Sequence, residues 1–202
     1  MYIPPRFKLK DEAQIRAYIR QYPFATLITA ANNYPIATHL PFILEQEGEQ
    51  WYLLSHMAKA NPQWKLLEES QPLVVFQEPH AYISPTYYEK EENVPTWNYI
   101  AVHVYGTVEM LLEKEQAVEV LEKTIAIFEK NFQQQWENLE GGYKKRLLNG
   151  MVAFRIKIQN FEAKEKLSQN KTVQERQTIS KGLLDTSDSS AQQLGEIMKN
   201  KL

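Results

Sequence analysis

The segment SHMAKANPQW, residues 55–64, carries the side chains best suited to hold an anion. A β-prone run delivers Ser55 and His56, Lys59 follows, and Asn61 precedes a proline. Asparagine is favoured at the N-cap of a helix and proline at its first position, so a helix is expected to begin here. Its free backbone N–H groups, its dipole and the lysine could together bind a phosphate. An ordinary capped helix with a solvated lysine fits the same residues, because nearly every helix start offers such groups.

The histidines are the other residues with obvious site chemistry, and all four lie in or beside expected strands: His39, His56, His80 and His103. No two of them have the i, i+4 spacing of a zinc-binding helix. Four histidines could build a metal or haem site, but each can equally be a half-buried strand residue with a hydrogen-bond partner. No metal site is predicted.

Two further segments carry side chains that could contact a ligand. In VPTWNY, residues 94–99, Trp97 could stack on a planar ligand beside Asn98, or fill an interface or the core. In KLSQN, residues 166–170, hydrogen-bonding side chains could meet the polar edge of a ligand, or simply form the loop into the next helix. There is no cysteine, no G-x-S-x-G elbow, no Walker loop and no G-x-G-x-x-G. No catalytic residue is predicted.

Short β-prone runs dominate the elements that must position these side chains. Strands are expected at 24–31, 36–44, 51–55, 73–77, 80–84, 99–111, 151–158 and 161–167. Helices are expected at 11–22, from 61, at 114–132, at 143–148, at 172–184 and in the last residues to 202. The helix at 114–132 has an apolar stripe at three- and four-residue spacing: Val118, Leu121, Ile125, Phe128 and Phe132. Closely spaced strands with few helices between them favour an antiparallel barrel over βαβ units.

Composition is that of a globular protein without a membrane segment. The chain has 202 residues, 43% of them hydrophobic, and a net charge of −2. That charge does not suit a protein that grips DNA through many phosphate contacts. No apolar run is long enough to span a membrane or to act as a signal peptide, so a cytoplasmic location is expected. We expect a domain at 1–170 and a helical appendage at 171–202, packed on the barrel or on a partner subunit.

Eight short motifs, taken in order, resemble the PaiB family: MYIP (1–4), YPFATL (22–27), ATHLPF (37–42), HMAKANPQW (56–64), FQEPHAYISP (76–85), VPTWNY (94–99), VHVYG (102–106) and KLSQN (166–170). The match covers roughly residues 1 to 184. Each motif is short, but the ordered set is highly specific. Tyr87 departs from the pattern, since the family often has tryptophan there.

The resemblance implies a mainly β protein with α-helices. The expected fold is an antiparallel split β-barrel with peripheral helices, like FMN-binding flavin reductases and pyridoxamine phosphate oxidases. Such barrels pair as homodimers with the flavin at the subunit interface. Family members are described as negative transcriptional regulators of sporulation and degradative-enzyme genes. The implied role is therefore a regulator rather than an enzyme, with DNA or a regulatory protein as partner and FMN as ligand.

The resemblance also implies where FMN would bind. In related oxidases the second and third strands and the loop after them hold the flavin phosphate. The oxidases are rich in arginine and lysine there, whereas this sequence has only histidines and Lys59. The expected cofactor-binding residues are Thr38, His39, Leu40, Pro41, Ser55, His56, Lys59, Asn61, Trp97, Asn98, Lys166, Ser168 and Gln169. An FMN-dependent oxidoreductase, in which the cofactor supplies the chemistry, and a haem-binding split barrel are the alternatives.

Overall fold

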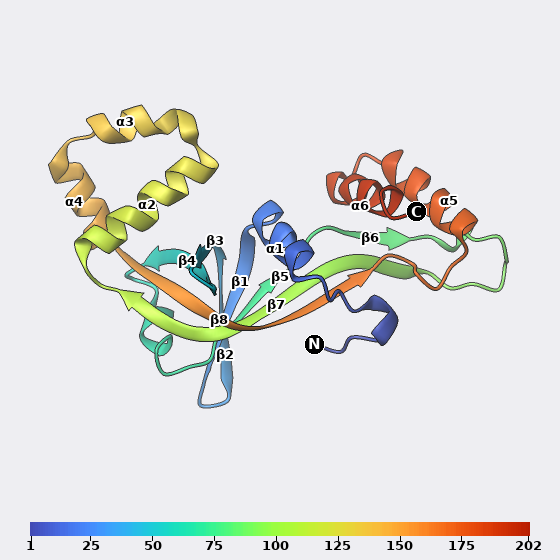
Figure 1. Ribbon diagram of the computed structural model, residues 1–202, viewed down its shortest axis with the longest axis horizontal. Helices are drawn as coiled ribbons and strands as arrows, with labels where there is room; N and C mark the ends of the chain where they lie inside the picture. The colour runs from blue at the N-terminus through green and yellow to red at the C-terminus, as the bar shows by residue number, and fades with distance from the viewer. The chain divides into compact units, whose positions relative to one another are not determined.

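The structure, a computed structural model, describes residues 1–202 (Figure 1). The chain divides into two compact units, each built from separate stretches of sequence. The first unit contains residues 1–18, 76–103 and 162–202, and the second contains residues 19–75 and 104–161. Helices α5 (Val173–Leu184) and α6 (Ser189–Lys199) thus belong to the same unit as residues 76–103. The division at residue 170 expected from the sequence stays a prediction.

The eight strands form one sheet in the order β2-β1-β5-β7-β8-β4-β3, with β6 paired to β7. The pairs β1–β2, β1–β5, β3–β4, β4–β8 and β6–β7 are antiparallel. The strands are β1 (Phe24–Ala31), β2 (Tyr34–Pro41), β3 (Ile43–Glu47), β4 (Gln50–Ala58), β5 (Leu73–Phe76), β6 (His80–Ile83), β7 (Thr96–Leu111) and β8 (Met151–Lys166). The fold is therefore the expected antiparallel sheet with helices.

A tight hairpin starts the second unit. Asn32 and Asn33 join β1 to β2, and both have a positive φ, 51° and 63°. Asparagine tolerates this left-handed conformation, and a two-residue turn with both φ positive matches the twist of a hairpin. The register that follows sets Thr26 opposite His39 and Leu27 opposite Thr38.

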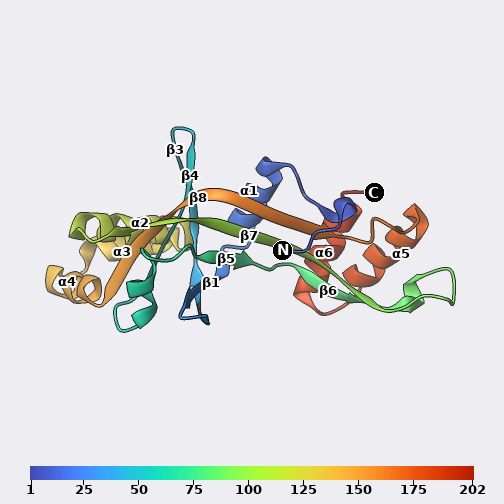
Figure 2. The ribbon, with the colours of Figure 1, turned by 90° about the horizontal axis from the view of Figure 1, so that it is seen from below.

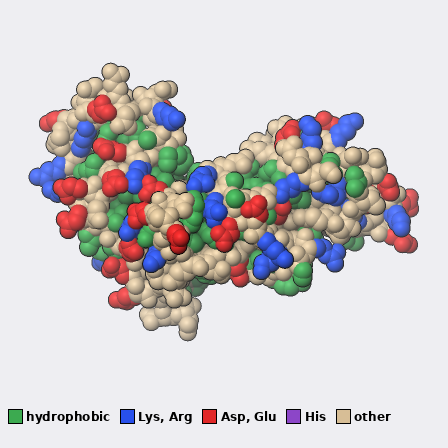
Figure 3. Space-filling view, viewed as in Figure 1, with side chains coloured by type: hydrophobic (Ala, Val, Ile, Leu, Met, Phe, Trp, Pro, Cys, Tyr) green, Lys and Arg blue, Asp and Glu red, His purple; other side chains and the backbone are tan.

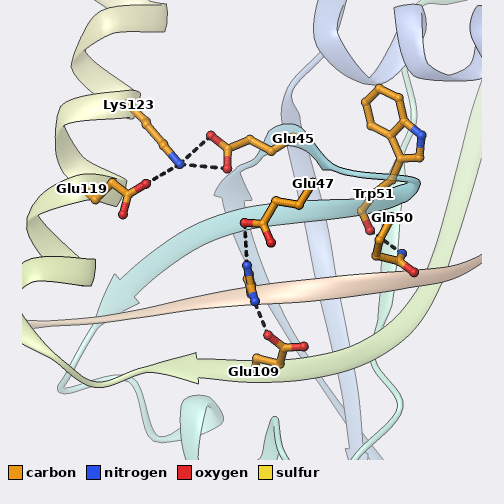
Figure 4. Close-up of polar contacts among 8 residues, drawn as sticks. Glu45, Glu47, Gln50, Trp51, Glu109, Glu119 and Lys123 are labelled. Carbon is orange, nitrogen blue, oxygen red and sulfur yellow. Dashed lines mark hydrogen bonds and ion pairs between the residues drawn. The ribbon is translucent and has the colours of Figure 1, made fainter.

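Three helices of the second unit lie between β7 and β8 in sequence: α2 (Lys114–Phe128), α3 (Gln133–Asn138) and α4 (Gly141–Asn149). Val120 of α2 is buried against an apolar cluster of the sheet that includes Ile43, Tyr52 and Leu54. Lys123 of α2 also pairs with Glu45 of β3 at 2.8 Å (Figure 4). Apolar burial and an ion pair thus hold the same face of α2 on the sheet.

An ion-pair network ties neighbouring strands of the second unit together. The guanidinium of Arg155 on β8 contacts Glu47 at 2.7 Å and Glu109 at 2.6 Å (Figure 4). It also lies 4.3 Å from the centre of the Tyr52 ring. Burial acts to lower the pKa of Arg155, but hydrogen bonds and charge from the two carboxylates outweigh it and raise the pKa. The guanidinium therefore stays charged between them.

The first unit contains the helices that end the chain, α5 (Val173–Leu184) and α6 (Ser189–Lys199), which pack on each other (Figure 2). Thr172 and Glu175 form the expected capping box at the start of α5. Ser190 at the start of α6 accepts a hydrogen bond from the His80 backbone N–H and donates one to the His80 carbonyl, both at 2.9 Å. These bonds fix α6 on β6.

Helix α1 (Glu12–Gln21) was predicted almost to the residue, because the Asp11 carboxylate accepts from the backbone N–H groups of Ala13 and Gln14 and Pro23 follows the helix. The strand expected at 36–44 is instead interrupted at Phe42. The Phe42 N–H donates to the Pro23 carbonyl at 2.8 Å, which continues the β1–β2 register by one bond before β3 begins at Ile43.

Other expected boundaries were wrong for local reasons. The two strands expected at 151–158 and 161–167 are the single strand β8, since neither glycine nor proline interrupts the chain between them. Helix α2 ends at Phe128 rather than at residue 132, and the short helix α3 was missed. Phe128, expected on the packed stripe, is 45% exposed. Val120, which the expected stripe leaves out, is instead the α2 residue that is buried against the sheet.

Candidate functional site

The SHMAKANPQW segment places Ser55 and His56 on opposite faces of β4, because successive strand residues alternate. Ser55 is buried and its hydroxyl donates to the Pro41 carbonyl at 2.7 Å, which fixes the end of β2 to β4. His56 is paired across the sheet with Ala153 of β8, so the two side chains share a face. Burial lowers the pKa of His56 below its ordinary 6.5, so the ring is neutral at physiological pH.

The helix expected at Asn61 is a short 3-10 helix, η2 (Pro62–Leu66). The cap itself is as predicted, since the Asn61 side chain accepts from the Gln63 N–H at 3.0 Å. A single short turn, however, lacks the aligned peptides that give a longer helix its dipole. The phosphate-binding capacity expected from a helix terminus is therefore small here.

Gln63, which the sequence did not single out, is the centre of a buried polar network. Its side chain is 0% exposed and its amide nitrogen donates to the carbonyls of Leu27 and Ile36, at 3.3 and 3.0 Å. Its amide oxygen accepts from the Thr38 hydroxyl, which also accepts from the Asn61 amide at 2.8 Å. Thr38 and Asn61 thus hold η2 on the β1–β2 hairpin. Only the burial of Gln63 reveals this, since nothing local in the sequence marks it.

The rest of the ATHLPF motif divides between surface and core. His39 is exposed, accepts or donates a hydrogen bond with Thr26 at 3.0 Å, and stacks near Phe24 with ring centres 6.4 Å apart. Leu40 is buried and Pro41 is half-buried. His39 therefore lies on the solvent side of the hairpin, and Thr38 lies on the core side.

Lys59 lines a cavity of about 270 Å³ in the second unit. Trp64, Lys114 and Asn149 line the same cavity, and apolar side chains of β7, α2, α4 and β8 form the rest of its wall. Ala153, the cross-strand partner of His56, is one of these wall residues. The Trp64 indole donates to the Lys59 carbonyl at 3.1 Å, which fixes the ring beside the lysine. The cavity thus combines two ammonium groups, an indole and an apolar wall.

In the first unit, Asn98 and Ser168 are buried and hydrogen-bond each other, with the Asn98 amide donating to the Ser168 hydroxyl at 2.9 Å. Gln169 closes the turn after β8: its amide donates to the Glu165 carbonyl at 2.6 Å and its oxygen accepts from the Leu167 N–H at 2.8 Å. These three side chains have partners inside the protein. Their expected role in cofactor binding stays a prediction.

Trp97 is an exposed side chain of this group, and Lys166 is half-buried. Trp97 is 53% exposed, with the rings of His80 and Tyr82 each 6.0 Å from its centre. The Lys166 ammonium donates to the Trp97 carbonyl at 2.6 Å and to the Thr96 hydroxyl. Trp97 therefore lies on an aromatic surface of the β6–β7 pair rather than in the core.

No three His, Asp or Glu side chains are arranged to hold a metal ion. His39 and His56 belong to the second unit, whereas His80 and His103 belong to the first. No helix of the structure is both long and apolar enough to cross a membrane.

Comparison with solved structures defines the class of fold. The structure resembles the flavocytochrome Anf3 from Azotobacter vinelandii, with a TM-score of 0.61 at 19% identity over 79% of this chain and 69% of that one. It also resembles an FAD and heme binding protein from Mycobacterium smegmatis, with a TM-score of 0.60 at 16% identity over 84% and 78% of the two chains. At these identities the likeness shows the fold, a split barrel of the pyridoxamine phosphate oxidase type.

Sequence comparison then gives the family. Residues 1–160 match a family model described as "Putative FMN-binding domain". The chain is 38% identical over 205 residues to "Protease synthase and sporulation protein PAI 2" of Bacillus subtilis, covering all of this chain and 98% of that protein. A yeast protein, YKL070W of Saccharomyces cerevisiae, is 42% identical over 77 residues, covering 35% of this chain and 46% of that protein. The chain therefore belongs to the PaiB family of FMN-binding-domain proteins, as the ordered motifs predicted.

Proposed function

We propose that this protein is a PaiB-type transcriptional regulator that binds FMN, and that it acts as a homodimer in the negative regulation of sporulation and degradative-enzyme genes. Two findings support it: the family model over residues 1–160 and the full-length similarity to the sporulation protein PAI 2. Regulation by a bound flavin requires only that FMN bind one state of the protein better than another.

The Lys59 cavity is the observation that carries the FMN assignment. A flavin phosphate needs positive charge and hydrogen-bond donors, and Lys59 and Lys114 supply two ammonium groups on one cavity. The flat isoalloxazine ring needs apolar and aromatic surface, which Trp64 and the surrounding wall supply. The residues present therefore fit FMN. When bound, FMN would contribute the capacity to take up electrons or a hydride.

The protein side chains would have distinct roles. Lys59 and Lys114 would balance the phosphate charge, and His56, whose pKa is lowered by burial, would add no charge beside the wall residue Ala153. Thr38, Asn61 and Gln63 would act at one remove by holding η2, and with it the chain that carries Lys59.

A dimer would complete this site. Ligand pockets usually measure about 300–1,000 Å³, and a cavity of 270 Å³ is small for a whole FMN molecule. The remainder of the flavin would lie against the partner subunit, as the split-barrel class implies. The net charge is −2, and acidic and basic side chains are interspersed on the face shown in Figure 3. A local basic patch or a protein partner would therefore mediate any action on DNA, in the cytoplasm.

The test is a titration of the purified protein with FMN, followed by flavin fluorescence, with Lys59→Gln and a matched control, Lys65→Gln. Lys65 is an exposed lysine on η2, the 3-10 helix that follows Lys59, and it does not line the cavity. We expect saturable binding that weakens about tenfold or more in Lys59→Gln and stays unchanged in Lys65→Gln. Equal affinities of the two variants would remove FMN from this cavity.

Two companion measurements address the rest of the proposal. Light scattering at micromolar concentration should give a dimer, and a monomer would count against an interface site. FMN-dependent oxidation of NAD(P)H with turnover would favour the oxidoreductase alternative over a regulator.

A further inference from the structure

A second cavity, lined only by residues of the first unit, has an unusual charge composition. It measures about 330 Å³ and lies among the N-terminal segment, the loop before β7 and the turn after β8. Arg6, Lys166 and Lys171 line it, and no aspartate or glutamate does. The chain as a whole has 25 acidic and 23 basic residues, so a wall with three cations and no carboxylate is a local concentration of positive charge.

Neutral partners hold the two lysines in place. Lys166 donates to the Trp97 carbonyl and the Thr96 hydroxyl. Lys171 donates to the Asn93 amide oxygen and lies 3.8 Å from the centre of the Tyr88 ring. These contacts orient each ammonium group without cancelling its charge, and a third N–H of Lys166 remains for a ligand.

Glu175 is the acidic residue whose charge interacts with that of Lys171, but its carboxylate is hydrogen-bonded within the capping box of α5. The Glu175 carboxylate accepts from the Thr172 N–H and hydroxyl, at 3.1 and 3.3 Å, in the capping box of α5. The pKa of Glu175 is lowered mainly by its hydrogen bond from the Thr172 backbone, with a smaller contribution from Lys171. Lys171 forms no ion pair with it. Arg6 is exposed and forms neither a hydrogen bond nor an ion pair.

Burial and a neighbouring cation outside the cavity wall both disfavour the charged form of Lys166. The pKa of Lys166 is lowered by burial and then by the nearby charge of Lys164. A bound anion would reverse both effects, because it replaces lost solvation and screens the repulsion. The arrangement thus favours a ligand with negative charge.

We propose that this cavity binds the phosphate group of a small phosphomonoester. Arg6 offers a planar fork that matches phosphate oxygens, and the two fixed lysines supply the additional charge that a dianion requires. Phe7, Tyr88 and Val94 form an apolar part of the wall that would receive the organic body of the ligand. This cavity shares no lining residue with the Lys59 cavity, although two of its residues, Lys166 and Ser168, are among those that the sequence assigned to FMN. Four of its lining residues, Lys166, Ser168, Asn170 and Lys171, lie beyond the family match that ends at residue 160.

Calorimetric titration of the full chain with phenyl phosphate and with inorganic phosphate tests the proposal. The variants are Arg6→Gln and Lys171→Gln, and the control is Lys10→Gln, an exposed lysine near Arg6 that does not line the cavity. We expect phenyl phosphate to bind saturably and more tightly than inorganic phosphate. Each cavity variant should lose about tenfold or more in affinity, and the control should lose none.

Thermal unfolding followed by circular dichroism would show that the Arg6→Gln chain is folded, since Arg6 makes no contact that folding needs. Absence of saturable binding by the wild-type chain, equal affinity for the two phosphates, or equal affinity of Arg6→Gln and Lys10→Gln would each overturn the proposal. Repeating the FMN titration separates the two cavities. FMN binding should survive Arg6→Gln, and its loss there would make this cavity part of the flavin site and overturn the inference.

Discussion

Asn98 and Ser168 form a reciprocal hydrogen-bonded pair in the first unit: the Asn98 amide nitrogen donates to the Ser168 hydroxyl at 2.9 Å, and that hydroxyl donates to the Asn98 amide oxygen at 3.2 Å. Both side chains are buried, and 70 residues of sequence separate them. The pair joins the start of β7 to the turn after β8. It explains why both the VPTWNY and the KLSQN segments carry polar residues in a buried place.

Breaking this pair should destabilise the protein. We expect Asn98→Ala to lower the free energy of unfolding by about 1–3 kcal/mol, because the buried Ser168 hydroxyl loses its partner.

Ser168 has a φ of 57°, a conformation that glycine adopts without steric cost. Ser168→Ala should therefore be less stable than Ser168→Gly by about 1 kcal/mol in urea denaturation. Equal stability of these two variants would contradict the strained turn.

Replacing Gln63 should loosen the hairpin and η2 together. Gln63→Leu removes donors to the Leu27 and Ile36 carbonyls and leaves Thr38 without its acceptor. We expect the free energy of unfolding to fall by about 1–3 kcal/mol, measured by chemical denaturation. Gln134→Leu, at an exposed position of the same unit, serves as control and should change it by less than about 0.5 kcal/mol. A similar loss in both variants would mean that the network contributes no specific stability.

Gly182 of α5 should not tolerate even a methyl group. A Cβ at this position would overlap the ring of Tyr87, which is half-buried against the helix. Gly182→Ala should cost about 1–3 kcal/mol of stability despite the better helix propensity of alanine. Gly141 begins α4 and has open space where its Cβ would lie, so Gly141→Ala should be neutral or slightly stabilising. Thermal unfolding of the two variants makes the comparison, and a stable Gly182→Ala would show that Tyr87 can move aside.

The buried His56 should make stability depend on pH. Because its folded pKa lies below 6.5, the unfolded chain binds more protons than the folded one between those two values. Stability is therefore fully present above pH 6.5 and is lost as pH falls from 6.5 through the folded pKa. His56→Gln should flatten this part of the curve, measured by urea denaturation at pH 5 to 8. His103, whose pKa is also lowered chiefly by burial, maintains a background slope in every variant.

Local signals in the sequence determined the elements that were predicted well. The bounds of β1 and the caps of α1 and α5 follow from β-branched runs, capping side chains and prolines, which act over a few residues. The ordered motifs determined the family and, through it, the split-barrel fold. These conclusions needed no knowledge of which side chains meet across the chain.

Only the tertiary structure decided which candidate side chains share a site. Lys59 and Lys114 line one cavity although they come from distant segments, and Arg6 lines another with Lys166 and Lys171. Ser55 and His56, adjacent in sequence, were separated because β4 turns them to opposite faces. Gln63 became structural because burial forces every polar atom to find a partner. Contacts between residues far apart in sequence set all of these arrangements, and no local pattern of residue types encodes them.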